Sequence, residues 1–321
     1  MTLPWPHIVF TTITFTTLPV YLLILFTICK QPKMSPFYIL MLSQAVADIF
    51  SLFCYFFLNT LRVSLWFADF FWENQAILAS CSFLSIYFTN YVRCVGITLI
   101  SVQRYITICQ SGKLLGKLMS EVPLPAYVFF HWTFALALWA PLCTSFDTLY
   151  NSKFKPDVIV PPAMLALGSM ITLIAIVVFF SISMLCYILI LIHVLNFNYL
   201  RNSSNRHEFR LCVQAAGLLI AFLLLFIYST GQFIINRASD LPLLFTWRLF
   251  NPLVTGFLSW VQPWMCLALN TEVRQNVLRI LFCRRKNLFV SRTSVVSVAK
   301  QPPSRFALPG NDQRRDSIPK Q

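Results

Sequence analysis

Charged residues are scarce in this sequence. Only 11% of its 321 residues are Asp, Glu, Lys or Arg, whereas 57% are hydrophobic. An ordinary soluble domain has about 25% charged residues, and a soluble fold with so few could not cover its own surface. The composition therefore excludes a soluble globular protein. It predicts an integral membrane protein, because lipid is the solvent that tolerates such an apolar excess.

Catalytic and metal-binding patterns are missing as well. The ten cysteines include no CxxC pair, and the chain has no HExxH sequence, no Gly-rich phosphate loop and no paired carboxylates. We therefore expect no enzymatic activity, no metal site and no cofactor.

Acidic residues are the rarer of the charged residues, 11 against 25 basic ones, which leaves a formal net charge of +14. Eleven of the basic residues follow position 273. Basic residues next to a membrane span more often interact with the anionic lipids of the cytoplasmic leaflet than with nucleic acid. We expect the lipid bilayer to be the partner of this charge, and no nucleic acid.

Seven stretches of the chain carry few or no charges, and each has at least the roughly 20 residues that a membrane-spanning helix needs. Their approximate bounds are His7–Cys29, Pro36–Asn59, Gln75–Cys109, Val122–Phe146, Ala163–Phe197, Leu211–Asn236 and Arg248–Asn270. This pattern predicts an all-α fold, an integral membrane seven-transmembrane helix bundle made by residues 1–270.

The basic residues also predict the orientation of the bundle. With the N-terminus outside, the inner loops and adjacent helix ends carry eight basic residues, the outer loops carry five, and the C-terminal segment adds eleven to the inside. Cytoplasmic segments are enriched in Lys and Arg. We therefore expect a multi-pass protein of the plasma membrane with an extracellular N-terminus and a cytoplasmic C-terminus.

Two further segments follow the bundle. Hydrophobic residues at helical spacing predict a short amphipathic helix in the inner membrane interface over residues 271–286. Residues 287–321 are dominated by Ser, Pro and Arg and are expected to be a disordered cytoplasmic tail. Cys283 is a candidate for palmitoylation, with a plain free thiol as the alternative. Ser317 is a candidate for phosphorylation, although matches to such sites arise by chance in most basic tails.

Only two full charges lie deep within the expected spans, Asp48 in the second and Arg93 in the third. Asp48 lies roughly 18 Å from the inner end of its helix, and Arg93 lies roughly 16 Å deeper than Arg104. A charge in lipid costs at least about 2.5–3.5 kcal/mol, so such residues usually have a partner. We expect a buried ion pair between Asp48 and Arg93. The alternative is that hydroxyls, carbonyls or water satisfy each charge separately.

Two short motifs, one at the inner end of the third span and one within the seventh, carry a possible switch. Arg104 and Tyr105 close the third span, where a lone arginine could also extend to the interface without any function. Gln262 and Pro263 lie in the seventh span near the depth of Asp48, and the proline leaves a carbonyl without its helical donor. A tolerated kink with no switching role is the alternative for Pro263.

These residues resemble signatures of the rhodopsin-like receptors. A Leu-x-x-Ala-x-Ala-Asp sequence ending at Asp48, Gln103-Arg104-Tyr105, and Gln262-Pro263-x-x-Cys266 correspond to that family's AD, DRY and NPxxY signatures. More closely, FYILMLSQAVADIF and YVRCVGITLISVQRYITIC are similar to the nematode serpentine chemoreceptors of class V, in the class G superfamily. The likeness extends over all seven spans.

The resemblance implies a G-protein-coupled receptor, a chemosensory one, for an unknown small-molecule ligand. In such a receptor, Asp48, Arg93, Gln262 and Pro263 would belong to a buried switch. Arg104 and Tyr105 would meet a heterotrimeric G protein when the inner half of the sixth span moves against the third and seventh.

The expected ligand pocket lies in the outer third of the bundle. Arg93 indicates which face of the third span points inward, and Ile86, Tyr87 and Asn90 lie outward of it near that face. They are the candidate pocket residues.

The sequence also departs from the family pattern. Gln103 replaces the acid of DRY, and Arg93 occupies the level where many relatives bind sodium, so no sodium site is expected. The usual disulfide to the second outer loop lacks its cysteine there, and a pairing of Cys81 with Cys143 stays open.

The main alternative function is a multi-pass transporter or channel. The chain shows no repeat relating two halves, no matching pair of Gly/Pro-broken segments and no run of acids that would form a ring. Ion flux through the purified protein in liposomes would support that alternative.

Overall fold

The computed structural model describes residues 3–30, 34–110, 114–144, 147–154, 156–196, 203–238 and 241–281. Within these ranges, seven helical segments are long and apolar enough to cross a membrane. They are Trp5–Cys29, Pro36–Ser64, Gln75–Cys109, Leu124–Thr144, Pro162–Val194, Ala216–Arg237 and Pro242–Leu269. The prediction of an all-α bundle with seven spans is confirmed.

The first half of the chain supplies the helices α1 (Trp5–Cys29), α2 (Pro36–Cys54), α3 (Arg62–Ser64), α4 (Ala68–Glu73), α5 (Gln75–Cys109), α6 (Leu114–Glu121) and α7 (Leu124–Trp139). The second half supplies the strands β1 (Leu149–Tyr150) and β2 (Val158–Ile159) and the helices α8 (Pro162–Asn196), α9 (Ser203–Arg237), α10 (Leu241–Arg248), α11 (Asn251–Leu269) and α12 (Thr271–Leu281). A π-helical segment, Tyr55–Leu61, continues α2 into α3, and a 3-10 segment, Ala140–Thr144, extends α7.

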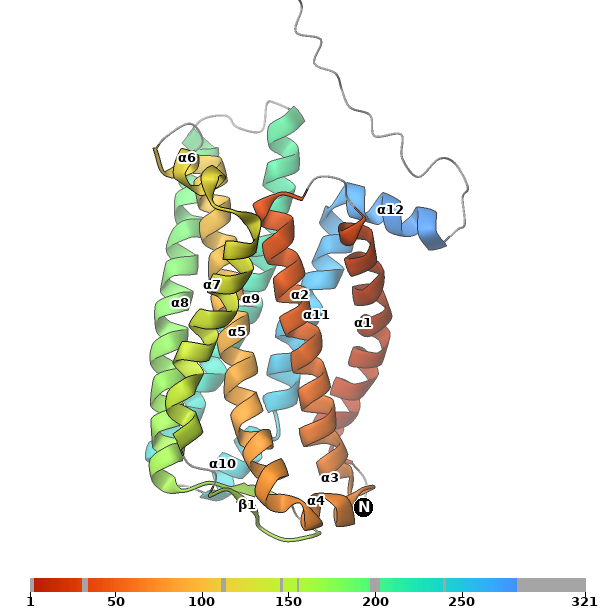
Figure 1. Cartoon of the computed structure of the whole chain (residues 1–321), viewed down its shortest axis with the longest axis vertical. Coiled ribbons are helices and arrows are strands. Elements are labelled where there is room, and N and C mark those ends of the chain that lie inside the picture. The colour runs from red at the N-terminus through yellow and green to blue at the C-terminus, as the bar shows by residue number, and fades with distance from the viewer. Residues whose placement is uncertain are drawn as a thin grey trace, which may run out of the picture. The chain divides into compact units, whose positions relative to one another are not determined.

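Helix α5 is the central element of the bundle, packed against α2, α7, α8 and α9. In the most apolar part of α5, 78% of the residues are buried, compared with 22% in the fourth span. Helix α11 packs against α1, α2 and α9. Figure 1 shows α3, α4, α10 and β1 at the end of the bundle where the N-terminus lies, and α6 and α12 at the opposite end. We call these the N-terminal end and the opposite end.

Large apolar side chains cover much of the outer surface of the helices. Phe53 is 63% exposed and Phe129 is 71% exposed, although both lie within membrane-spanning segments. Such side chains would expose a large apolar surface to water, whereas acyl chains solvate them well. The exposed phenylalanines therefore fit helices whose outer faces contact lipid.

The end of the second span differs from its sequence-based boundary. Arg62 was expected in an outer loop after Asn59, but the helix continues to Ser64 and buries Arg62 to 8% exposure. The π-helical segment keeps the backbone hydrogen-bonded at this point, and the side chain of Asn59 accepts a hydrogen bond from Arg62 Nη2 at 3.4 Å. The charge of Arg62 predicted a loop in water, because the sequence alone does not show which groups lie next to its side chain.

A helix follows the seventh span and is described from Thr271 to Leu281, whereas residues 282–286 of the predicted helix 271–286 lie outside the described residues. Val273 and Val277 are buried against the bundle, and Arg274 is exposed. Its position in the membrane interface stays a prediction. The expected tail, 287–321, lies outside the described residues.

Gly96 allows three helices to meet in the core. A Cβ at this position of α5 would lie 1.9 Å from Gln44 Oε1 of α2 and 2.7 Å from His131 Nε2 of α7. The His131 ring is itself held in place, because Nδ1 lies 2.8 Å from Ser43 Oγ and Nε2 lies 2.7 Å from the carbonyl oxygen of Val92. The close packing of α2, α5 and α7 therefore depends on a residue without a side chain.

We expect Gly96→Ala to destabilise the protein by about 1–3 kcal/mol through overpacking. The measurement is the thermal unfolding midpoint of the purified protein in detergent. Gly217→Ala is the matched control, because its Cβ would meet only the flexible side chain of Met265, with Cε at 2.6 Å and Cγ at 3.1 Å. Both variants gain the same helix propensity, so equal midpoints would contradict the role of Gly96.

Candidate functional site

A polar network occupies the middle of the bundle, with Asp48 of α2 at its centre. Asp48 has no exposed surface. Its Oδ2 accepts a hydrogen bond from the Tyr21 hydroxyl at 2.7 Å, and its Oδ1 accepts from Ser259 Oγ at 3.2 Å and from Gln44 Nε2 at 3.4 Å. Helices α1, α2 and α11 therefore all contribute a group to one buried carboxylate.

Arg93 of α5 is the second member of the network and is also fully buried. Its Nε donates to the carbonyl oxygen of Thr89 at 3.0 Å, and its Nη2 donates to Asn90 Oδ1 at 2.8 Å. Its Nη1 donates to the carbonyl oxygen of Thr255 at 2.7 Å and to Ser259 Oγ at 3.2 Å. The guanidinium thus links α5 to α11.

The expected direct ion pair is not formed. No salt bridge of 4.0 Å or less joins Asp48 to Arg93, both of which lie in the described part of the chain. The reason is that the guanidinium turns toward α11, and the hydroxyl of Ser259 stands between the charges, donating to the carboxylate and accepting from the arginine. Hydroxyls, carbonyls and amides satisfy the two charges, while their opposite signs still attract in a medium of low dielectric.

Pro263 lies inside α11, one turn after Ser259. Because proline has no N–H, the carbonyl of Ser259 loses its helical donor at the point where the Ser259 side chain holds the network. Gln262 ties the same segment to α2, since its Nε2 donates to the carbonyl oxygen of Met41 at 3.3 Å. The structure thus brings the predicted switch residues to the contact of α2, α5 and α11. A switching role stays a prediction.

Arg104 lies near the opposite end of α5 and is only 2% exposed. Its guanidinium carbon is 3.4 Å from the ring centroid of Phe37, at the start of α2, which is a close cation–π contact. Gln103, in the place of the family's acid, donates from Nε2 to Thr107 Oγ1 at 2.9 Å. An aromatic ring from another helix therefore contacts this arginine where the sequence lacks the usual neighbouring carboxylate.

Tyr105 is half-buried beside Arg104 and faces α8. Tyr105 packs against the apolar cluster of Ile108, Ile190 and Val194, and its hydroxyl accepts a hydrogen bond from Gln110 Nε2 at 2.9 Å. Tyr105 therefore couples the end of α5 to α8.

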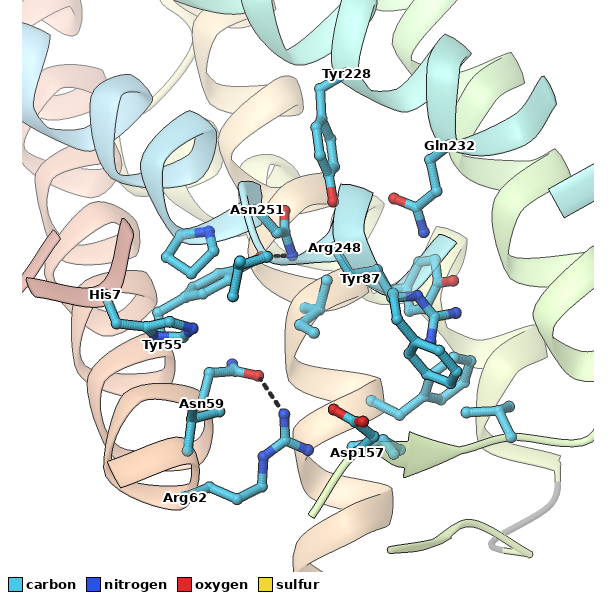
Figure 2. A pocket seen from close by; sticks show the side chains of 18 residues that line it. His7, Tyr55, Asn59, Arg62, Tyr87, Asp157, Tyr228, Gln232, Arg248 and Asn251 are labelled. Carbon is cyan, nitrogen blue, oxygen red and sulfur yellow. Dashed lines mark hydrogen bonds between the residues drawn. The ribbon is translucent and has the colours of Figure 1, made fainter. Parts of the chain in front are cut away.

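A cavity of about 140 Å³ opens at the N-terminal end of the bundle. Residues from α1, the end of the second span, α5, the β2 region, α9, α10 and α11 line it (Figure 2). Its polar and charged lining includes His7, Asn59, Arg62, Asp157, Tyr228 and Arg248. None of these was a candidate from the sequence, because they come from five separate parts of the chain and no local pattern marks their convergence.

Two of the candidate pocket residues, Ile86 and Tyr87, line this cavity. Asn90 lies deeper, beside a smaller cavity of about 30 Å³ that Ile86 and Tyr87 also line. The Asn90 side chain accepts a hydrogen bond from Arg93, so it connects the floor of the pocket region with the polar network. Binding of a ligand by these three residues stays a prediction.

Four residues were candidates for a disulfide or for a covalent modification, and two of them lie in the described part of the chain. Cys81 and Cys143 are both free thiols, so the structure does not contain the disulfide that was left open. Cys283 and Ser317 lie outside the described residues.

Seven apolar helices around a buried polar network define a multi-pass membrane protein of the seven-helix class. The family model described as serpentine type 7TM GPCR chemoreceptor Srv matches residues 10–283, which is most of the chain. The protein therefore belongs to this family of chemoreceptors. No curated protein compared with the chain matches it.

We expect Ser259→Ala to lower the stability of the purified protein by about 1–3 kcal/mol, because Asp48 loses a donor and Arg93 loses an acceptor inside the bundle. The measurement is the thermal unfolding midpoint. Ser101→Ala is the matched control, since Ser101 is equally buried but its hydroxyl donates at 2.8 Å only to the carbonyl oxygen of Ile97 on its own helix. A Ser259→Ala midpoint no lower than that of Ser101→Ala would show that the hydroxyl is dispensable.

Proposed function

We propose that this protein is a plasma-membrane receptor, and not an enzyme, that binds a small ligand in the cavity at its N-terminal end and activates a heterotrimeric G protein at the opposite end. One observation carries the proposal. A single helix, α5, presents Ile86 and Tyr87 to the cavity, Arg93 to the polar network, and Arg104 and Tyr105 to the opposite end.

The N-terminus is proposed to be extracellular. The basic residues concentrate in the segments that this orientation places in the cytoplasm, which agrees with the general bias of membrane proteins. The cavity then opens toward the outside, where a chemosensory ligand arrives, and Arg104 lies near the cytoplasm.

The ligand is proposed to act by binding one helix arrangement more tightly than another. The polar network suits a two-state element, because its hydrogen bonds join α2, α5 and α11 through one hydroxyl at Ser259 and any shift of α11 changes them. Pro263 weakens the helix one turn further along. The moving part would be the half of α9 nearest the G protein.

The receptor proposal is tested in cells that express the protein with a reporter of G-protein activation and are exposed to a panel of small molecules. We expect at least one molecule to raise the signal, and Arg104→Ala to remove that response because the G protein loses its contact. An N-terminal epitope tag labelled on intact cells gives the surface amount and should be equal for both proteins. Labelling of a C-terminal tag on intact cells instead, or ion flux in liposomes without any G-protein response, would refute the proposal.

A second prediction concerns the resting state. The contact of Arg104 with Phe37 is buried, and such a cation–π contact contributes about 2 kcal/mol when desolvated. We expect Phe37→Leu to raise ligand-independent G-protein activation several-fold by releasing Arg104. Phe129→Leu, which changes a lipid-facing phenylalanine, is the control and should leave the basal signal unchanged. A basal signal in Phe37→Leu equal to that of the control would mean that the ring does not restrain Arg104.

A further inference from the structure

Arg62 is the most unusual charged residue of the cavity. It is only 8% exposed, yet its Nε and Nη1 are buried without a hydrogen-bond partner among the described residues. The remaining nitrogen, Nη2, makes one long hydrogen bond of 3.4 Å to Asn59 Oδ1. A buried guanidinium normally has its donors satisfied, because an unpaired buried charge is costly. The free donors of Arg62 point to a partner that enters the cavity.

The groups around Arg62 do not neutralise it. Asp157 lines the same cavity, but no salt bridge of 4.0 Å or less joins it to Arg62 in the described structure. Tyr150 is a neighbour with which Arg62 also has a side-chain hydrogen bond, and its ring centroid lies 5.5 Å from the guanidinium carbon. Burial raises the pKa of Tyr150, so its phenol stays neutral at physiological pH and is no counter-ion.

Arg248 supplies a second cation to the cavity from α10, and Figure 2 shows it and Arg62 reaching in from different elements. Its guanidinium carbon lies 5.9 Å from the ring centroid of Phe245, a contact that uses none of its five N–H donors. With Arg62, Arg248 and Asp157 in the lining, the formal charge of the cavity is +1 when His7 is neutral.

Two neutral groups of the cavity also have hydrogen-bond donors without a partner among the described residues. Asn59 Nδ2 is buried without a hydrogen-bond partner in the described part of the chain, and so is the hydroxyl of Tyr228. Both can donate a hydrogen bond, and Asn59 Nδ2 can only donate. The rest of the lining is largely apolar, with Phe83, Ile86 and Leu249 among its residues.

We propose that the ligand of this cavity is a small organic carboxylate whose oxygens accept hydrogen bonds from Arg62 and Arg248 and whose short apolar part lies against Phe83, Ile86 and Leu249. A monoanion balances the single net positive charge, and a carboxylate is acceptor-only, as the unsatisfied donors require. The inference rests on the proposed function in that it identifies the ligand class of the receptor.

The test uses the purified full-length protein in detergent at constant ionic strength and pH. Thermal unfolding midpoints are measured with hexanoate, with its uncharged analogue hexanamide, and with inorganic phosphate. We expect hexanoate to raise the midpoint by several degrees in a saturable way, and hexanamide and phosphate to raise it much less. A shift with hexanamide equal to that with hexanoate, a larger shift with phosphate, or no hexanoate shift at all would overturn the proposal.

Three variants locate the binding to the cavity. Arg62→Gln should abolish the hexanoate shift. Arg237→Gln should retain it, because Arg237 lies outside the cavity in a similar contact, 5.8 Å from the ring centroid of Phe233. Asp157→Asn should increase the affinity for hexanoate several-fold by removing the negative charge, a gain that misfolding cannot produce. An unchanged hexanoate shift in Arg62→Gln, or weaker binding in Asp157→Asn, would contradict the assignment.

Because this experiment needs no G protein, its outcome is separable from that of the receptor proposal. Hexanoate binding that depends on Arg62, together with no G-protein response to any ligand, would refute only the receptor function. Activation by neutral molecules that is unchanged in Arg62→Gln would refute only the carboxylate assignment.

Discussion

The structure depends most on one requirement, that a fully buried guanidinium in the middle of a membrane bundle must find acceptors for its N–H donors without bulk water. Arg93 meets it with two backbone carbonyls, an asparagine oxygen and the hydroxyl of Ser259. Two of these acceptors belong to α11, so Arg93 holds α5 and α11 at one separation. The same hydroxyl donates to Asp48 and extends the constraint to α2.

Three buried arginines in the described part of the bundle differ in the contacts that their guanidinium groups make. Arg93 has hydrogen-bond partners on all three nitrogens that donate. Arg104 lies against the face of Phe37, a contact that breaks without leaving an unpaired carboxylate. Arg62 keeps free donors beside a cavity. A satisfied arginine serves structure, one that lies against an aromatic ring suits a switch, and an unsatisfied one suits a ligand.

The central position of α5 connects these sites. A helix buried on most of its surface transmits a displacement to every helix that packs on it, because a dense core does not deform continuously. The outer helices contact lipid through exposed phenylalanines and can move at lower cost.

The sequence by itself determined the class of solvent, the number of spans and the positions of Asp48, Arg93 and Arg104 along their helices, because these follow from the length of apolar runs and the fixed rise of a helix. Apart from the third span, whose inward face Arg93 indicated, it could not determine which way the helices face. Spans that are apolar all round, such as α1, carry no polar stripe that would reveal their rotation. Only the tertiary structure therefore decided that Ser259 stands between the two charges, and that Arg62 turns into a cavity, since both depend on rotation and rotamer.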